Sequence, residues 1–84
     1  MSRFAVIWLT DAEQEARRLL AHSRFSRALA EAFRQIDELL ALQPRRGTHL
    51  HEGLWRLELP IVTAFYVVNE ESQRVEVAQI QSLV

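Results

Sequence analysis

Residues 54–68 read LWRLELPIVTAFYVV and carry the patterns of two successive β-strands. Over residues 54–59 the side chains alternate with period two, the pattern of a β-strand that is covered on one face only. One face receives Trp55, Leu57 and Leu59, and the other receives Leu54, Arg56 and Glu58. Pro60 has no N–H for a sheet ladder and ends this strand. Residues 61–68 are mostly β-branched or aromatic, which predicts a second strand in the centre of a sheet.

The sequence that follows predicts a third strand. Residues 69–73, NEESQ, form a polar turn, and residues 74–81 return to an apolar pattern. The two faces of this strand are expected to carry Val75 with Val77 and Ala78 with Ile80. Three successive antiparallel strands make a meander, whose apolar face has to be covered by other elements.

The chain begins with a short apolar run, RFAVIWL over residues 3–9. Such a run is typical of a strand buried on both faces, so we predict a central strand, beside the last strand and parallel to it. Thr10 and Glu13 follow with the spacing of a capping box, and a helix is expected over residues 11–21. Its inward side chains are predicted to be Ala12, Ala16, Leu19 and Leu20.

A second helix is predicted to begin after Ser23, which has the residue type of an N-cap, and to run to about Leu42. Apolar residues recur there at intervals of three and four, which makes an inward stripe. The stripe consists of Phe25, Leu29, Ala32, Ile36, Leu39 and Leu40. Pro44 cannot continue the hydrogen-bond ladder and ends the helix. The two helices then form an antiparallel hairpin that can cover the sheet, and residues 45–53 form a polar loop with a short extended piece.

These elements predict a single α+β domain over residues 1–84, in the order β-α-α-β-β-β. The helix hairpin is expected to pack on a twisted, mainly antiparallel sheet. A length of 84 residues is enough for one small domain and too short for two. Apolar residues make up 49% of the chain and charged residues 25%, which argues against a disordered protein.

Composition excludes several classes of site. The absence of cysteine excludes a disulfide scaffold, a thiol nucleophile and a Cys-ligated metal. No apolar run approaches the ~20 residues that span a membrane, and residues 1–4 begin no secretory signal, so we expect a cytoplasmic protein without a membrane partner. The net charge of −1 does not by itself indicate nucleic-acid binding. All ten cations are Arg, whose planar fork suits phosphate or carboxylate, although a GC-rich genome would give the same bias.

The sheet face away from the helices is expected to be half open. It carries Leu54, Arg56, Glu58, Thr63 and Phe65. This mixture of apolar and charged side chains suits a protein partner or a substrate, and an exposed Phe65 would mark an interface.

The order of the elements and several segments resemble the RelE/ParE superfamily of toxin proteins. The resemblance rests on a first strand ending in WLT, the acidic helix start DAE, a second helix that ends in Pro, LHEGLWRL at residues 50–57 and AFYVV at residues 64–68. It covers nearly the whole chain. It implies the toxin half of a type II toxin–antitoxin system of the plasmid-stabilisation kind, with no cofactor. It also implies a cognate antitoxin that wraps the toxin with a segment that folds on binding.

Members of this superfamily divide by target. RelE-like members cut messenger RNA on the ribosome, and ParE-like members inhibit DNA gyrase. RelE-like nucleases carry an Arg on the strand that ends in the Tyr, where this chain has Val62 and Thr63, and a basic cluster after the last strand, where it has QIQSLV. These departures favour a toxin that acts by binding its target. The oligomeric state stays open between a homodimer and a heterotetramer with the antitoxin.

Two alternatives to this binding function stay open, and with them the question of enzyme activity. One is a ribosome-dependent endoribonuclease with a reduced catalytic site built on Arg56, His51 and Arg46. The other is a small, non-toxic, dimeric binding domain. For the binding function, contacts to the target or the antitoxin are expected at Leu54, Arg56, Glu58, Phe65 and Arg45. Arg45 and Arg46 are otherwise interpreted as a solvated pair in a loop.

His49 and His51 stand two residues apart and would share a face on a regular strand. With Glu52 or His22 they would make an incomplete ligand set, so the sequence favours a solvated polar loop and no metal site. His51 precedes the strand that lines the half-open face and is therefore the candidate acid–base group.

Overall fold

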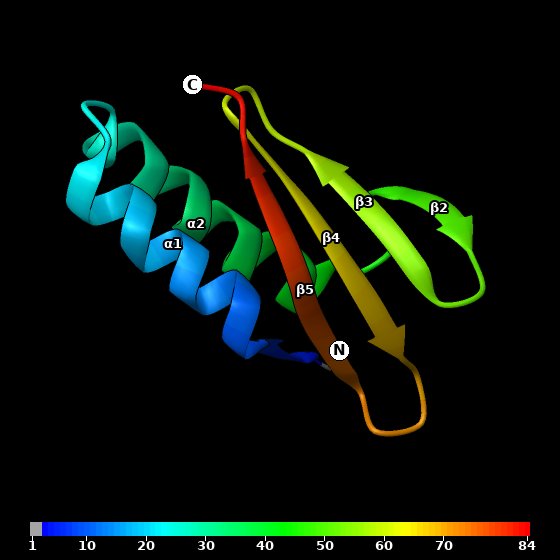
Figure 1. Cartoon of the computed structure of the whole chain (residues 1–84). Coiled ribbons are helices and arrows are strands. Elements are labelled where there is room, and N and C mark those ends of the chain that lie inside the picture. Colours follow the sequence, from blue (N-terminus) through cyan, green and yellow to red (C-terminus); the bar gives the residue numbers. More distant parts are fainter. Residues whose placement is uncertain (1–2) are drawn as a thin grey trace.

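The computed structural model describes residues 3–84. Its elements follow in the order β1 (Ala5–Trp8), α1 (Thr10–His22), α2 (Ser26–Leu42), β2 (Thr48–His51), β3 (Leu54–Glu58), β4 (Val62–Asn69) and β5 (Arg74–Ser82) (Figure 1). The predicted α+β architecture is confirmed, and β2 is the extended piece expected within residues 45–53. Neither helix within residues 3–84 is long and apolar enough to span a membrane.

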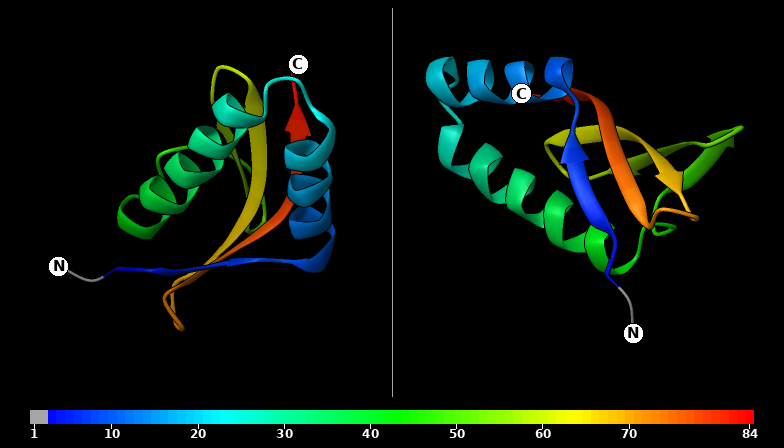
Figure 2. Two further views of the ribbon diagram at one scale, coloured as in Figure 1. Left: turned by 90° about the vertical axis from the view of Figure 1, so that its left-hand side faces the viewer. Right: turned by 90° about the horizontal axis from the view of Figure 1, so that it is seen from below.

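The strands form one sheet in the order β1-β5-β4-β3-β2. β1 pairs with β5 in parallel, and all the other neighbours pair antiparallel, as predicted. Both helices lie to one side of this sheet (Figure 2). The hairpin of α1 and α2 therefore covers one face, and the other face is left without a helix in the described part of the chain.

The position of β1 corrects one prediction. It lies beside β5 and parallel to it, as expected, but at the edge of the sheet rather than in its centre. Its apolar side chains pack on α2: the rings of Trp8 and Phe33 meet edge to face with centroids 5.7 Å apart, and Trp8 Nε1 donates to Asp37 Oδ1 at 2.7 Å. The apolar run of residues 3–9 is explained by packing of β1 against a helix. Such a run therefore does not require a neighbouring strand on each side.

The first helix begins without the predicted side-chain cap. Leu9 is the N-cap, and its carbonyl accepts from Glu13 N at 2.9 Å. Its own N–H donates to Val77 O of β5, so the sheet holds Leu9 and makes Thr10 the first helical residue. The predicted capping box of Thr10 and Glu13 is therefore wrong. Leu20, predicted to face inward, is 39% exposed because it lies beyond the stripe that α1 turns to the core.

The start of α2 also differs from the prediction. Ser23 lies in the turn between the helices, where its Oγ accepts from Phe25 N at 3.0 Å, and α2 begins only at Ser26. Phe25 was expected to face inward but is 46% exposed, because it precedes the first helical turn. Phe33, which the predicted stripe omits, is buried against Trp8.

The core lies between the helix hairpin and the sheet. Its fully buried side chains come from α2, β4 and β5 and are Leu29, Ile36, Leu40, Val62, Ala64, Tyr66, Val75 and Val77. Tyr66 is the largest of them. A buried phenol needs a hydrogen-bond partner, and Tyr66 finds two, at Pro44 and Gly47.

A bulge in β5 changes which side chains share a face. Val77 pairs with Tyr66 of β4. The next paired residue of β5 is Gln79, which leaves Ala78 as the extra residue. The extra residue turns Ile80 back to the helix side, where it is only 4% exposed, beside the fully buried Val77. The prediction that Ile80 and Val77 lie on opposite faces is therefore wrong.

Candidate functional site

The sheet face opposite the helices carries most of the residues predicted for binding. It is formed by the cross-strand pairs Leu54–Val67, Arg56–Phe65 and Glu58–Thr63, and we call it the open face. Its apolar centre is only half-buried, and Phe65 lies there as expected. Thr63 is 7% exposed and so contributes less surface than predicted, because paired residues flank it on both neighbouring strands.

The charges on this face are balanced. Arg56 Nε lies 2.9 Å from Glu58 Oε1, but the N–H does not point at the carboxylate, and Nε is buried without a hydrogen-bond partner. On β5 a second pair has the same spacing, with Arg74 Nη2 3.8 Å from Glu76 Oε2. Residues two apart on a strand share a face, so each guanidinium has a carboxylate beside it. A polyanion would meet as many carboxylates as guanidiniums, whereas an apolar protein segment with mixed charges would be complementary.

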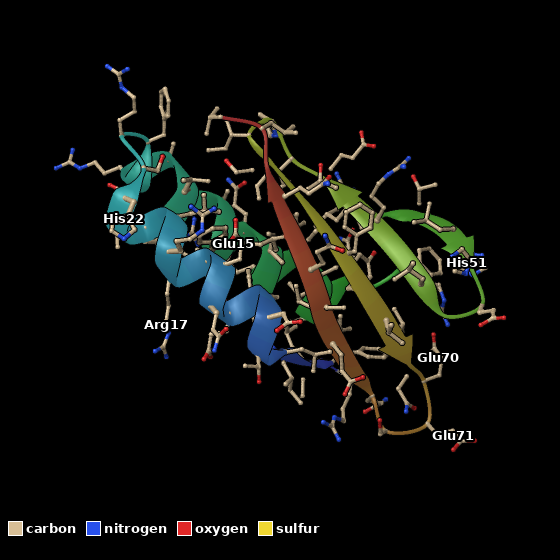
Figure 3. The ribbon with its side chains drawn as sticks, in the orientation of Figure 1. Glu15, Arg17, His22, His51, Glu70 and Glu71 are labelled. Atoms are coloured by element: carbon tan, nitrogen blue, oxygen red, sulfur yellow. The ribbon has the colours of Figure 1, made fainter. Side chains whose placement is uncertain are left out.

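Arg46 and Arg56 meet at one small pocket. It has a volume of about 240 Å³, lies between the end of α2 and β3, and is also lined by Thr48 and Glu58. The structure thus brings together two of the three residues predicted for catalysis. The third, His51, pairs with Leu54 at the far end of β2 and does not line the pocket (Figure 3). The pocket offers two cations, a hydroxyl and a carboxylate, without an imidazole to take a proton.

Arg45 and Arg46 have different neighbours, although they are adjacent in sequence. Arg45 forms an ion pair with Glu70 in the turn between β4 and β5. Arg46 Nη1 donates instead to Gln43 Oε1 at 3.2 Å. Both residues are exposed, and they do not form one phosphate-binding patch. Arg45 therefore lies apart from the other predicted binding residues.

A bulge in β2 separates the two histidines. His49 pairs with Trp55, but His51 pairs with Leu54, and the register shifts between them. Because Trp55 and Leu54 are neighbours on β3, they point to opposite faces, and so do the two histidines. The ring of His49 lies on Trp55 with centroids 4.9 Å apart, and its Nε2 is 3.3 Å from Glu52 O. The predicted common face is wrong.

The described residues contain no group of three or more His, Asp or Glu side chains that could hold a metal ion. The separation of His49 and His51 onto opposite faces accounts for the loss of the one candidate pair. Residues 3–84 therefore offer no assembled metal centre, and the chemistry of the site rests on arginines, carboxylates and hydroxyls.

Tyr66 has a positioning role that the period-two pattern did not reveal. Its hydroxyl donates to Pro44 O at 2.8 Å and accepts from Gly47 N at 3.2 Å. Both partners flank Arg45 and Arg46, so one buried side chain ties the connection between α2 and β2 to the sheet. Burial raises the pKa of the Tyr66 hydroxyl, and the hydrogen bond from Gly47 N opposes that shift. In the sequence, the signal for this contact is that Pro44 and Gly47 flank the two arginines.

No protein-family model and no curated protein matches this chain. Solved structures do match it. The toxin–antitoxin complex RelBE2 from Mycobacterium tuberculosis contains a chain that is 20% identical, with a TM-score of 0.81 over 98% of this chain and 93% of that one. The intact RelBE toxin–antitoxin complex of E. coli matches with 19% identity and a TM-score of 0.68 over 94% and 95% of the two chains. The chromosomal ParDE system of P. aeruginosa matches with 15% identity and a TM-score of 0.67 over 98% of each chain.

At these identities the likeness concerns the fold. It extends over nearly the whole chain, and it includes both RelE and ParE structures. The RelE/ParE-like fold that the sequence predicts is confirmed.

Proposed function

We propose that this chain is the toxin component of a type II toxin–antitoxin system, acting in the cytoplasm by binding a cellular target and neutralised by a cognate antitoxin. The observation that carries the proposal is the shared fold over 98% of the chain with a protein solved as part of a toxin–antitoxin complex. The plasmid-stabilisation role belongs to the same proposal, as does assembly with the antitoxin; a homodimer and a heterotetramer with the antitoxin are the two oligomeric states to distinguish.

Binding rather than RNA cleavage is supported by the balanced charges of the open face. Cleavage of RNA needs a group that takes the 2′-hydroxyl proton and cations that stabilise the charge of the transition state. On the open face Arg56 stands beside Glu58, and Phe65 and Thr63 lie opposite them on β4. We propose Leu54, Arg56, Glu58 and Phe65 as contacts to the target or the antitoxin, with Arg45 as an outlying contact. DNA gyrase is the protein target to test.

A second function, ribosome-dependent cleavage of messenger RNA, is favoured by one observation. Arg46 and Arg56 line the same pocket, and Thr48 lines it as well. Two guanidiniums at one pocket suit a phosphodiester. Glu58 in that pocket and the distant position of His51 count against this function, because the pocket then lacks a base and carries a repelling charge.

The test is growth after tightly controlled expression in a bacterial host, followed by sequencing of RNA ends and a supercoiling assay with purified gyrase. Growth arrest with intact messenger RNA would support binding of a protein target, and loss of supercoiling would identify gyrase. Arrest with new cuts between codons would support the nuclease instead. Unimpaired growth at a confirmed level of folded protein would contradict both, and a stable homodimer would then favour a non-toxic binding domain.

A further inference from the structure

Within residues 3–84, the outer edge of β5 has no neighbouring strand beyond Val77. β1 pairs with β5 only from Arg74 to Val77. The last bond of this ladder runs from Leu9 N to Val77 O at 2.9 Å, and the chain then turns into α1. The carbonyl of Leu9 turns away from β5 and accepts from Glu13 N in the first turn of α1, so the ladder ends here.

The direction of the backbone groups on this edge follows from the pairing with β4. Leu83 N donates to Ile61 O at 2.8 Å, so these two residues form a hydrogen-bonded pair. Hydrogen-bonded and non-hydrogen-bonded pairs alternate along an antiparallel ladder. Counting back along β5, Gln81 bonds to β4, whereas the N–H and C=O groups of Ser82 and Ile80 point away from it. No side chain within residues 3–84 hydrogen-bonds to these outward groups.

This edge borders a groove between α1 and the end of β5. The groove has a volume of about 690 Å³, and α1 contributes a stripe of side chains at intervals of four, four and three residues: Asp11, Glu15, Leu19 and His22. Figure 3 shows Glu15 on the side of α1 next to β5 and Arg17 pointing away from it. Ile80 and Ser82 line the opposite wall. The unpaired backbone groups therefore border this groove, with Ser82 half-buried and Ile80 4% exposed.

We propose that this groove binds an extended segment of a partner protein, which adds to β5 as a short strand at Ile80 and Ser82. Unpaired backbone groups at a sheet edge are a template for another extended backbone with alternating donors and acceptors. The edge lies beside a helix wall, so a single strand reaches it more readily than the surface of a second folded copy. The segment binds outside the open face, and the inference stands without the proposed toxin function.

The charge of the helix wall indicates which segment fits. Glu15 is bound by Arg18, whose Nε and Nη2 donate to its two carboxylate oxygens at 2.9 and 2.6 Å. Asp11 has no ion-pair partner within residues 3–84. A Lys or Arg of the incoming strand would satisfy Asp11, and an apolar side chain would cover Leu19 further along the groove. Arg18 and His22 line the same groove, so its charge favours one cation opposite Asp11 rather than a strongly basic segment. The partner segment is therefore extended, with a Lys or Arg that reaches Asp11 and an apolar centre.

The test uses the whole chain and a synthetic heptapeptide, acetyl-TKTVTKT-amide, which reads the same in both directions and presents lysine, valine and lysine on one face. Amide exchange followed by NMR is expected to show fast exchange at Ile80 and Ser82 and slow exchange at Gln81 in the free chain. Saturating peptide should slow exchange at Ile80 and Ser82 at least about tenfold. Changes confined to the open face, or no change at millimolar peptide, would overturn the proposal. Protection of these amides by raising the protein concentration alone would assign the edge to a second copy and would also overturn it.

Two variants give matched controls. Ser82→Pro removes the outward N–H and should weaken peptide binding about five- to tenfold, whereas Ser82→Ala keeps the N–H and should bind like the unaltered chain. Asp11→Asn should abolish the preference for this peptide over its counterpart with glutamate in place of both lysines. Equal binding by Ser82→Pro and Ser82→Ala would contradict the backbone pairing. If Ser82→Pro fails to fold, the exchange measurement on the unaltered chain decides alone.

Discussion

The hydroxyl of Tyr66 lies 3.2 Å from the backbone nitrogen of Gly47, which donates a hydrogen bond to it across 19 residues of chain. The same hydroxyl donates to Pro44 O. A fully buried side chain of β4 thus holds the two ends of a short connection whose middle residues, Arg45 and Arg46, are exposed. This contact ties to the sheet the connection that carries Arg46 to the pocket.

Tyr66→Phe should lower the free energy of unfolding by about 1–3 kcal/mol, because Pro44 O and Gly47 N each lose a buried partner. Urea unfolding followed by tryptophan fluorescence measures this loss. An unchanged midpoint would show that water replaces the hydroxyl without penalty.

High pH should destabilise the folded chain through the same residue. Burial raises the pKa of Tyr66 in the folded state, so the folded chain holds this proton more tightly than the unfolded chain. The stabilisation is complete below the unfolded pKa of about 10 and is lost as the pH rises through the higher folded value. Tyr66 is the single tyrosine of the sequence, so absorbance of tyrosinate near 295 nm reports it alone. Tyr66→Phe should lose less stability over this pH interval, and a pKa at or below 10 would contradict the prediction.

Gly47→Ala should destabilise the chain strongly, by about 2 kcal/mol or more, since the added Cβ would lie 2.3 Å from Arg56 O and 2.7 Å from the Tyr66 hydroxyl. Gly53→Ala is the matched control, because its Cβ would meet only Val67 Cγ1 at 3.4 Å and should change stability by less than about 0.5 kcal/mol. Equal effects in thermal unfolding would show that crowding at Gly47 is relieved by small shifts.

The contact between Trp8 and Asp37 should contribute modestly to the attachment of β1. Asp37→Ala removes the acceptor of Trp8 Nε1 and is expected to cost about 1 kcal/mol, since the bond is exposed to solvent. Asp37→Asn keeps an oxygen acceptor and should retain most of that stability. Chemical denaturation of the two variants measures the difference, and a larger loss for Asn than for Ala would refute the assignment.

Arg56→Ala should reduce both growth inhibition and antitoxin binding at least about tenfold, because Arg56 belongs to the open face and also lines the pocket. Arg17→Ala is the control, since Arg17 is 76% exposed on the outer side of α1 and pairs only with Glu13 at 3.4 Å. Both variants should keep the circular dichroism spectrum of the unaltered chain. If Arg56→Ala leaves inhibition and binding as they were, the assignment of this residue is wrong.

Much of the fold could be predicted because its signals are local. The alternation over residues 54–59, the β-branched run before Val68 and Pro44 at the end of α2 each act within a few residues of chain, and all three elements appear where expected. The parallel neighbour of β1 was also predicted. Its place at the edge was not, because the same apolar run serves a strand between two strands and a strand beneath a helix.

The residues of the candidate site were likewise predicted correctly only in part. The two-residue alternation along residues 54–59 predicted that Leu54, Arg56 and Glu58 share one face, and the structure confirms this. The histidines and Ile80 were misassigned because a bulge adds one residue and reverses every face beyond it. Whether a strand bulges depends on how it packs against its neighbour, and the strand's own residue types do not encode it.

The elements, their order and the faces of the unbulged strand β3 follow from the sequence alone, since periodicity and chain breaks are properties of neighbouring residues. Three features appear only in the folded chain: Tyr66 reaches back to Pro44 and Gly47, Arg46 meets Arg56, and the end of β5 stays unpaired within residues 3–84. The first two are contacts between segments distant in sequence, and the third arises because β1 turns into α1 after Val77. All three depend on how the helix hairpin packs on the sheet around one small core.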